Sequence, residues 1–81
     1  TEIIKENDLY QTPDLALATT ISLFYPLEGM DRRTHKAQFS FKRDGQLDAL
    51  IECYWRGELK VEPQAYFNAM RVIKTRLYNE A

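Results

Sequence analysis

Apolar residues recur along the chain with two periods, one typical of strands and one typical of helices. The clearest strand signal covers residues 36–43, where Ala37, Phe39 and Phe41 alternate with polar neighbours. A period of two predicts a strand with one buried face and one polar face. Residues 27–33 predict a second strand, joined to the first by a short turn. Such one-sided burial favours an antiparallel sheet that is covered on a single face.

The first helix is predicted between Thr12 and Pro26. Thr12 can accept a hydrogen bond at the helix start, and Pro26 cannot continue a helix. Between them, Leu17, Ile21 and Phe24 recur at helical spacing and predict a buried stripe.

Two further helices follow in the second half of the chain. Asp44 is a good N-cap for an amphipathic helix that we expect to end at Gly57. Pro63 suits the first turn of a last helix, which is predicted to run to about Tyr78.

The predicted order of elements is β-α-β-β-α-α, with a first short strand at Leu9–Gln11. The third strand is expected to lie between the other two, antiparallel to both. The sequence therefore predicts an α+β fold, a small two-layer domain whose short antiparallel or mixed sheet is covered on one face by helices. We expect residues 1–8 to form a flexible N-terminal segment and residues 9–81 to form one domain.

Size and composition indicate a folded binding module and not an enzyme. With 44% hydrophobic and 28% charged residues, the chain is too apolar for a disordered protein. Its 81 residues leave little room for an enclosed pocket, so no small-molecule substrate and no cofactor are expected. The net charge of −1 does not by itself predict a nucleic-acid or an acidic partner.

Residues suited to catalysis or metal binding are sparse. A single cysteine, Cys53, excludes an internal disulfide and zinc sites built on paired cysteines. His35 is the only histidine, and it lies in an expected turn. We therefore predict no catalytic residue and no metal ligand. The sequence shows neither a signal-peptide pattern nor an apolar run of about 20 residues, so we expect a cytoplasmic protein without a membrane partner.

The predicted hairpin carries a basic stretch without any acidic residue. Five cations occur in it: Arg32, Arg33, Lys36, Lys42 and Arg43. A basic hairpin can contact the phosphates of a nucleic acid. The same charges also protect an exposed strand edge from aggregation, so a purely solvated edge is an equally direct interpretation.

The last helix carries an aromatic and basic row. Steps of four, three and four residues place Phe67, Arg71, Lys74 and Tyr78 along one side. Aromatic rings can stack on bases while cations hold phosphates. Alternatively the rings belong to the rim of the core and the long basic side chains lie over them.

Two aromatic residues at helix ends are candidates for contacts with a protein partner. Trp55 follows Tyr54 of the buried stripe and is therefore turned about 100° away from the core. Tyr25 follows the stripe of the first helix in a similar way. Exposed aromatic residues are enriched at protein interfaces, although a Trp packed at the helix end near Arg56 explains the pattern as well.

Three segments together resemble a family of small bacterial and phage proteins classed as a domain of unknown function. The segments are TPDLALA, QFSF and YWRGELKVEPQAYFNAMRVIKTRLY. The resemblance extends from about Tyr10 to Tyr78. It implies a compact intracellular α+β domain and carries no particular activity.

Two functions are consistent with the sequence. The first, which we favour, is a non-enzymatic module that binds nucleic acid through the basic hairpin and the aromatic and basic row of the last helix. The second is a protein-interaction module or homodimer that uses exposed aromatics: Trp55, Tyr25, Phe67 and Tyr78.

Overall fold

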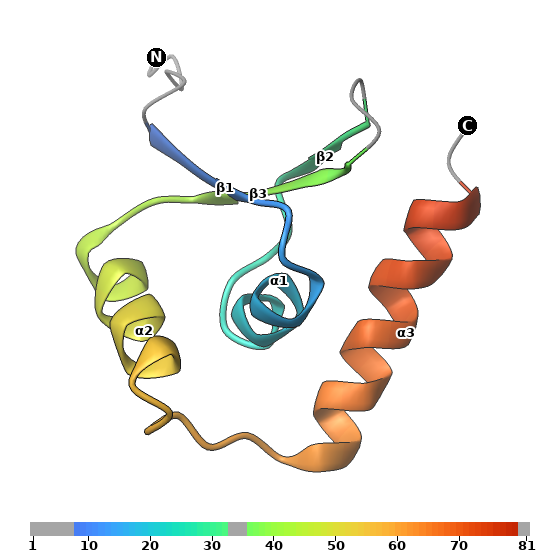
Figure 1. Ribbon diagram of the computed structural model, residues 1–81. Helices are drawn as coiled ribbons and strands as arrows, with labels where there is room; N and C mark the ends of the chain where they lie inside the picture. The colour runs from blue at the N-terminus through green and yellow to red at the C-terminus, as the bar shows by residue number, and fades with distance from the viewer. Residues whose placement is uncertain (1–7, 33–35, 80–81) are drawn as a thin grey trace.

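The computed structural model describes residues 8–32 and 36–79 and has the predicted order of elements. These residues form one three-stranded sheet and three helices (Figure 1). The element bounds are β1 Leu9–Thr12, α1 Leu15–Ser22, β2 Gly29–Asp31, β3 Gln38–Lys42, α2 Gly45–Trp55 and α3 Pro63–Asn79. Apart from Asp8, the segment expected to be flexible lies outside the described residues.

The central strand of the sheet is β3, as the sequence predicts. It pairs antiparallel with β1 on one side and with β2 on the other. Tyr10 lies opposite Phe41, and Met30 lies opposite Phe39. Because opposite residues of an antiparallel pair point to the same face, these four side chains form the apolar face of the sheet.

The other face of the sheet is polar and is not covered by a helix (Figure 1). Ser40 lies on this face and is nevertheless buried. It is paired with Gln11 of β1, whose side-chain Nε2 donates to the Ser40 hydroxyl at 3.2 Å. The neighbouring Lys42 of β3 is exposed. A hydrogen bond between strands thus replaces apolar packing on this side.

Helix α1 is surrounded by the rest of the fold. It contacts α2, α3 and β1, and its residues 17–21 are all buried. Two of these are polar, but the Thr19 hydroxyl donates to the Leu15 carbonyl at 2.8 Å. The Thr20 hydroxyl donates to the Ala16 carbonyl at 2.9 Å. Each hydroxyl is therefore satisfied within α1, and the methyl groups remain available for packing.

The start of α1 differs from the prediction that Thr12 caps it. Thr12 belongs to β1, where it pairs with Phe39. The N-cap is Asp14, whose carboxylate accepts from the Leu17 amide at 3.2 Å. The Thr12 hydroxyl instead accepts from the Asp14 amide at 3.1 Å and shapes the turn between strand and helix. The cap moves to Asp14 because the backbone of Thr12 is used by the sheet.

Helix α2 begins and ends as the sequence predicts. The Asp44 carboxylate accepts from the Leu47 amide at 2.8 Å and caps the first turn. At the other end, Gly57 has a φ of 73°, and its amide donates to the Tyr54 carbonyl at 3.0 Å. Glycine adopts this left-handed conformation without the steric cost of a Cβ atom, so it stops the helix.

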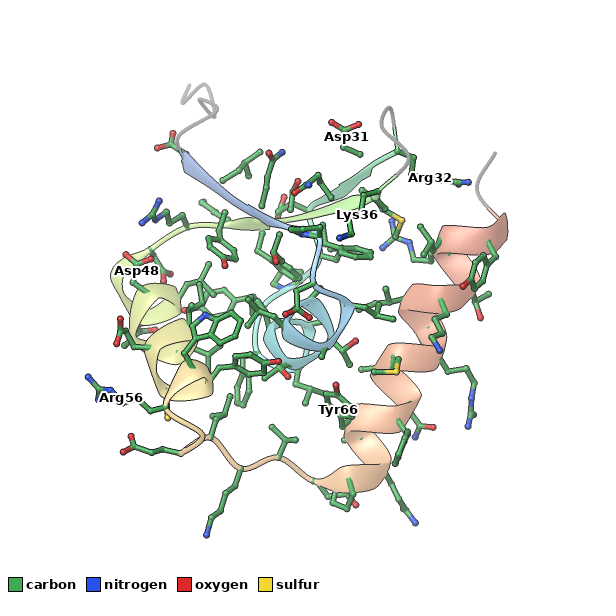
Figure 2. All side chains as sticks on the ribbon, in the orientation of Figure 1. Asp31, Arg32, Lys36, Asp48, Arg56 and Tyr66 are labelled. Atoms are coloured by element: carbon green, nitrogen blue, oxygen red, sulfur yellow. The ribbon has the colours of Figure 1, made fainter. Side chains whose placement is uncertain are left out.

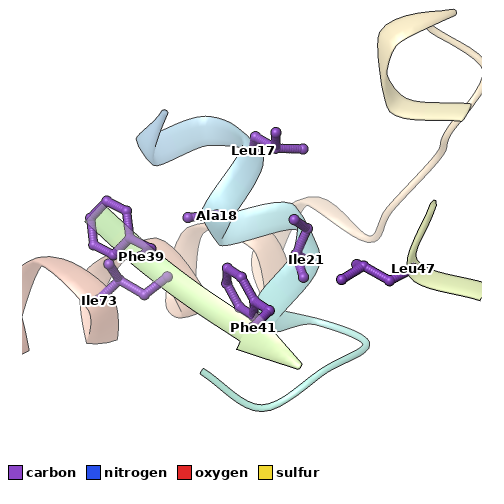
Figure 3. Packing of buried hydrophobic residues seen from close by; sticks show 7 residues of the cluster. All are labelled: Leu17, Ala18, Ile21, Phe39, Phe41, Leu47 and Ile73. Carbon is purple, nitrogen blue, oxygen red and sulfur yellow. The ribbon is translucent and has the colours of Figure 1, made fainter. Parts of the chain in front are cut away.

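The core lies where the three helices meet the sheet, and side chains fill the space between them (Figure 2). Its buried apolar residues come from α1, β3, α2 and α3, and they are Leu17, Ala18, Ile21, Phe39, Phe41, Leu47 and Ile73. In Figure 3, Ile73 lies beside Phe39 and Leu47 lies beside Ile21. Each outer helix thus contributes a buried side chain to the core: Leu47 of α2 packs beside α1, and Ile73 of α3 packs beside the sheet.

A side-chain hydrogen bond joins the turn after α1 to the start of α2. The Tyr25 hydroxyl donates to the Asp44 carboxylate at 2.9 Å. Together with the bond from the Leu47 amide, which has the larger effect, it holds the pKa of Asp44 below its ordinary value. The pKa of Tyr25 is raised, mainly by desolvation and then by its bond to Asp44.

The buried ring of Phe41 is expected to be essential for folding. The Phe41→Ala variant leaves a cavity between β3 and α1, which typically costs about 3–5 kcal/mol. A small domain has a free energy of unfolding on the order of 5 kcal/mol, so this variant should be only marginally folded, with a urea midpoint far below that of wild type by circular dichroism. Phe67→Ala, which changes an exposed ring, is the control and should keep the wild-type urea midpoint. An unchanged midpoint for Phe41→Ala would contradict the assigned core.

The stabilising effect of Asp44 is expected to depend on pH. Because its pKa is lowered in the folded state, its contribution is complete above the unfolded value of about 3.9 and disappears as the pH falls through the folded value. We expect Asp44→Ala to lower the thermal midpoint at neutral pH, with a gap to wild type that narrows in acid.

The matched variant for this experiment is Asp44→Asn, because Asn caps helices but does not titrate. Its midpoint should stay near the wild-type value at neutral pH and fall less on acidification. A gap between wild type and Asp44→Ala that stays constant down to about pH 2 would rule out this role of the carboxylate.

Candidate functional site

The aromatic and basic row of α3 lies on the exposed side of the helix. Helix α3 is an outermost element and packs against α1 with the adjoining side of the helix, so the row lies beside the packed stripe and not opposite it. On that inner side Ile73 is buried and Leu77 packs against the core. The row itself, which we call the α3 face, consists of Phe67, Arg71, Lys74 and Tyr78, and all four residues are exposed.

The two rings of the α3 face lie mostly in solvent. Phe67 is 64% exposed and Tyr78 is 77% exposed. Phe67 contacts the neighbouring Tyr66 ring edge to face, with centroids 6.2 Å apart. Burial in the core therefore does not account for either aromatic side chain. The alternative that they form the rim of the core does not fit these exposures.

The charge of α3 is entirely positive. Between Pro63 and Asn79 the sequence contains Arg71, Lys74 and Arg76 and no acidic residue. Intrahelical ion pairs three or four residues apart, which often neutralise surface helices, are therefore impossible within this stretch. The cations of α3 create a local positive potential on a protein whose net charge is −1.

A shallow, open depression of about 580 Å³ runs along the α3 face. Among residues 8–32 and 36–79, its lining comes from α3 and consists of Phe67, Met70, Arg71, Lys74, Thr75 and Tyr78. Because no second element closes over it, it suits an extended chain laid along the helix better than an enclosed small molecule.

The basic residues of the hairpin do not form one cluster. Lys42 is the last residue of β3, whereas Lys36 precedes its first residue, Gln38, so the strand, roughly 13 Å long at the rise of an extended chain, separates them. Arg43 lies next to α2 and pairs with Asp48, with Nε and Oδ1 3.2 Å apart. Arg33 lies outside the described residues. The stretch is continuous in sequence, but the strand separates its charges in space.

The remaining hairpin cations lie on the side of α3. Figure 2 shows Arg32 and Lys36 at the end of the sheet nearer α3, while Asp48 marks the opposite side of the molecule at α2. Arg71 and Lys74 are therefore the centre of the candidate surface. Arg32 and Lys36 lie toward the sheet, where the carboxylate of Asp31 offsets part of their charge. Lys42 and Arg43 belong to the α2 side.

The charge of the α2 region is opposite to that of α3. Residues 43–58 carry four acidic side chains and two basic ones, a net of −2, whereas residues 63–79 carry +3. Helices α2 and α3 lie on opposite sides of α1 (Figure 1). The near-zero total charge thus conceals a separation of charge across the molecule.

Trp55 is exposed at the end of α2. Its exposed fraction is 63%, and its ring meets the Tyr54 ring edge to face with centroids 5.0 Å apart. The adjacent Arg56 pairs with Glu52 at 3.6 Å. The side chain of Trp55 is therefore available to a partner at the end of α2.

Tyr25 is not the exposed aromatic that its position after the first helix indicates. It is half-buried, packs against the core and donates its hydroxyl to Asp44. The exposed ring is Phe24, at 54%, which the helical spacing placed in the core. Because α1 ends at Ser22, Phe24 and Tyr25 lie in the turn after it. In this turn Phe24 points into solvent and Tyr25 packs against the core.

Like Phe24, Val72 of α3 is an exposed apolar residue that the sequence pattern did not reveal. It lines a smaller groove of about 290 Å³ between α3 and the segment after α1. A helical pattern shows which residues share a side, but it does not show how far the neighbouring element covers that side.

The described residues offer no grouping for metal chemistry. Among residues 8–32 and 36–79, no three His, Cys, Asp or Glu side chains gather as a metal site. Cys53 is half-buried, and His35 lies outside this part of the chain. None of the helices in the same part combines the length and apolar character of a membrane span.

One family accounts for nearly the whole chain. The family described as Domain of unknown function (DUF5659) matches residues 7–79. No curated protein and no solved structure shows significant similarity to the chain. The match agrees with the resemblance seen in the sequence and includes every described secondary-structure element. The chain is a member of the DUF5659 family.

Proposed function

We propose that this domain is a non-enzymatic module that binds nucleic acid through the α3 face. The observation that carries the proposal is the exposed pair Arg71 and Lys74 on a helix without acidic residues. A phosphate backbone is the common cellular polyanion that such a row of cations can follow. The open form of the depression supports a long ligand that continues beyond the protein at both ends.

The expected affinity is modest and depends on salt. Each cation that neutralises a phosphate releases counterions. The logarithm of the affinity therefore falls linearly with the logarithm of the salt concentration, with a slope proportional to the number of phosphate contacts. Two such contacts from the α3 face correspond to binding in the micromolar range or weaker at physiological salt. The acidic α2 region would face away from the ligand, where it opposes binding least.

The proposal places the protein in the cytoplasm of a bacterial or phage-infected cell. Nucleic acid is accessible there, and a lone thiol such as Cys53 stays reduced.

The exposed Trp55 favours a second candidate function, a contact with a protein partner or a second copy of this chain. Trp is enriched among the residues that contribute most to protein interfaces. This surface lies on α2, away from the α3 face, so the two functions can be tested separately.

The nucleic-acid proposal predicts that Arg71→Gln/Lys74→Gln weakens binding of a labelled 12-nucleotide oligomer about tenfold at low salt. The slope of log affinity against log salt should also become shallower by about one for each lost phosphate contact. Fluorescence anisotropy at about 20 and 150 mM salt measures both quantities.

Arg56→Gln/Lys60→Gln is the matched control for this experiment. It changes the net charge equally but lies outside α3, and it should bind within about twofold of wild type. Polyglutamate of similar length should compete poorly. Absence of binding at low salt, an equal loss in both variants, or equal competition by polyglutamate would contradict the proposal.

The protein-contact candidate predicts self-association or capture of a partner that depends on Trp55. Wild-type protein should show a mass that rises with concentration in sedimentation analysis, and Trp55→Ala should abolish the rise. Phe67→Ala, on the other outer helix, should leave it unchanged. A strict monomer at high concentration would exclude the homodimer.

A further inference from the structure

We infer that the α3 face takes single-stranded nucleic acid, with Phe67 and Tyr78 stacking on unpaired bases and Arg71 and Lys74 holding the phosphates between them. The inference rests on the proposed function and names its ligand more closely.

The two rings of the α3 face are exposed without a structural reason. Large aromatic side chains cover much apolar surface, and a protein gains nothing in folding by leaving them in water. Phe67 and Tyr78 are the two most exposed large apolar side chains of the described residues. Leu77, the preceding residue, packs against the core, whereas Tyr78 does not. The ring of Tyr78 is thus dispensable for packing and available to a ligand.

The rings and cations follow one another along the helix in an order that fits a strand of nucleic acid. Phe67 and Tyr78 are eleven residues apart in sequence, which corresponds to about 16 Å along an α-helix. Arg71 and Lys74 lie between them on the same side. At about 3.4 Å per stacked nucleotide, this length accommodates no more than about five nucleotides. A strand laid along the depression can therefore meet a ring at each end and a cation in the middle.

Only an unpaired strand of nucleic acid can use these rings for stacking. In a duplex the faces of the bases are stacked on each other, and only their edges are accessible. An aromatic ring gains from a base only if the face of that base is free, which requires an unpaired strand. A face made of cations alone would not discriminate between the two forms. The two exposed rings therefore favour a single strand.

The experiment compares three labelled probes of equal phosphate number at low salt. They are a 12-nucleotide oligothymidylate, a 12-unit abasic strand with the same phosphates but without bases, and a duplex hairpin. We expect the oligothymidylate to bind at least about tenfold more tightly than the abasic strand and the duplex, because stacking adds to the shared electrostatic attraction.

Variants assign the effect to the rings. Phe67→Ala/Tyr78→Ala should reduce binding of oligothymidylate about tenfold or more and leave binding of the abasic strand unchanged. Phe24→Ala/Val72→Ala removes two other exposed apolar side chains and should bind all probes like wild type. Circular dichroism of each variant confirms that the fold is intact.

The outcomes separate this inference from the proposed function. If all three probes bind alike and depend on Arg71 and Lys74, the proposed function stands and the single-strand inference is overturned. It is also overturned if oligothymidylate is preferred but the double aromatic variant binds it like wild type. If no probe binds at low salt, both are overturned.

Discussion

Helix α1 is the element on which the packing of this domain depends. Five consecutive residues of it are buried, so its whole circumference in this region must be apolar or internally satisfied. Thr19 and Thr20 meet this condition because their hydroxyls bond to carbonyls of the same helix. The sheet, α2 and α3 can then each pack against a different side of α1. The smallest helix of the fold thereby organises the two larger ones.

This arrangement leaves one side of each outer helix, α2 and α3, without packing contacts to the core. Because α1 is short, α3 extends well beyond it in length, with 17 residues against 8. Among the side chains of α3 whose burial the structure describes, Ile73 alone is fully buried in the core. The outer side of α3 is consequently free of structural demands, and its composition can serve binding. The same holds for α2, which contributes Leu47 to the core and leaves Trp55 in solvent.

Much of the fold follows from the sequence because local signals and tertiary packing agree. The alternation around Phe39 and Phe41, the cap at Asp44 and the stop at Gly57 each specify one backbone conformation. The predicted cap at Thr12 was wrong because Thr12 belongs to β1 and pairs with β3. A local pattern cannot reveal such competition between neighbouring elements.

The candidate site was predictable only in part, because a local sequence pattern does not show how neighbouring elements pack. Helical periodicity is enough to place Phe67, Arg71, Lys74 and Tyr78 on one side. Whether that side is covered depends on the neighbouring helix, which periodicity does not show. The exchange of Phe24 and Tyr25 depends on where α1 ends, and the splitting of the hairpin cations depends on the length of β3. These features arise from three-dimensional geometry.

The separation of charge between α2 and α3 has a kinetic consequence. A molecule with a positive and a negative side has an electric dipole, and it experiences a torque in the field of a polyanion. For the proposed nucleic-acid ligand, this torque would turn α3 toward the strand before contact, although the net charge of −1 would give slight repulsion at long range. Orientation of this kind acts within about one Debye length, near 8 Å at physiological salt. An almost neutral protein can thus approach a charged strand with the correct side first.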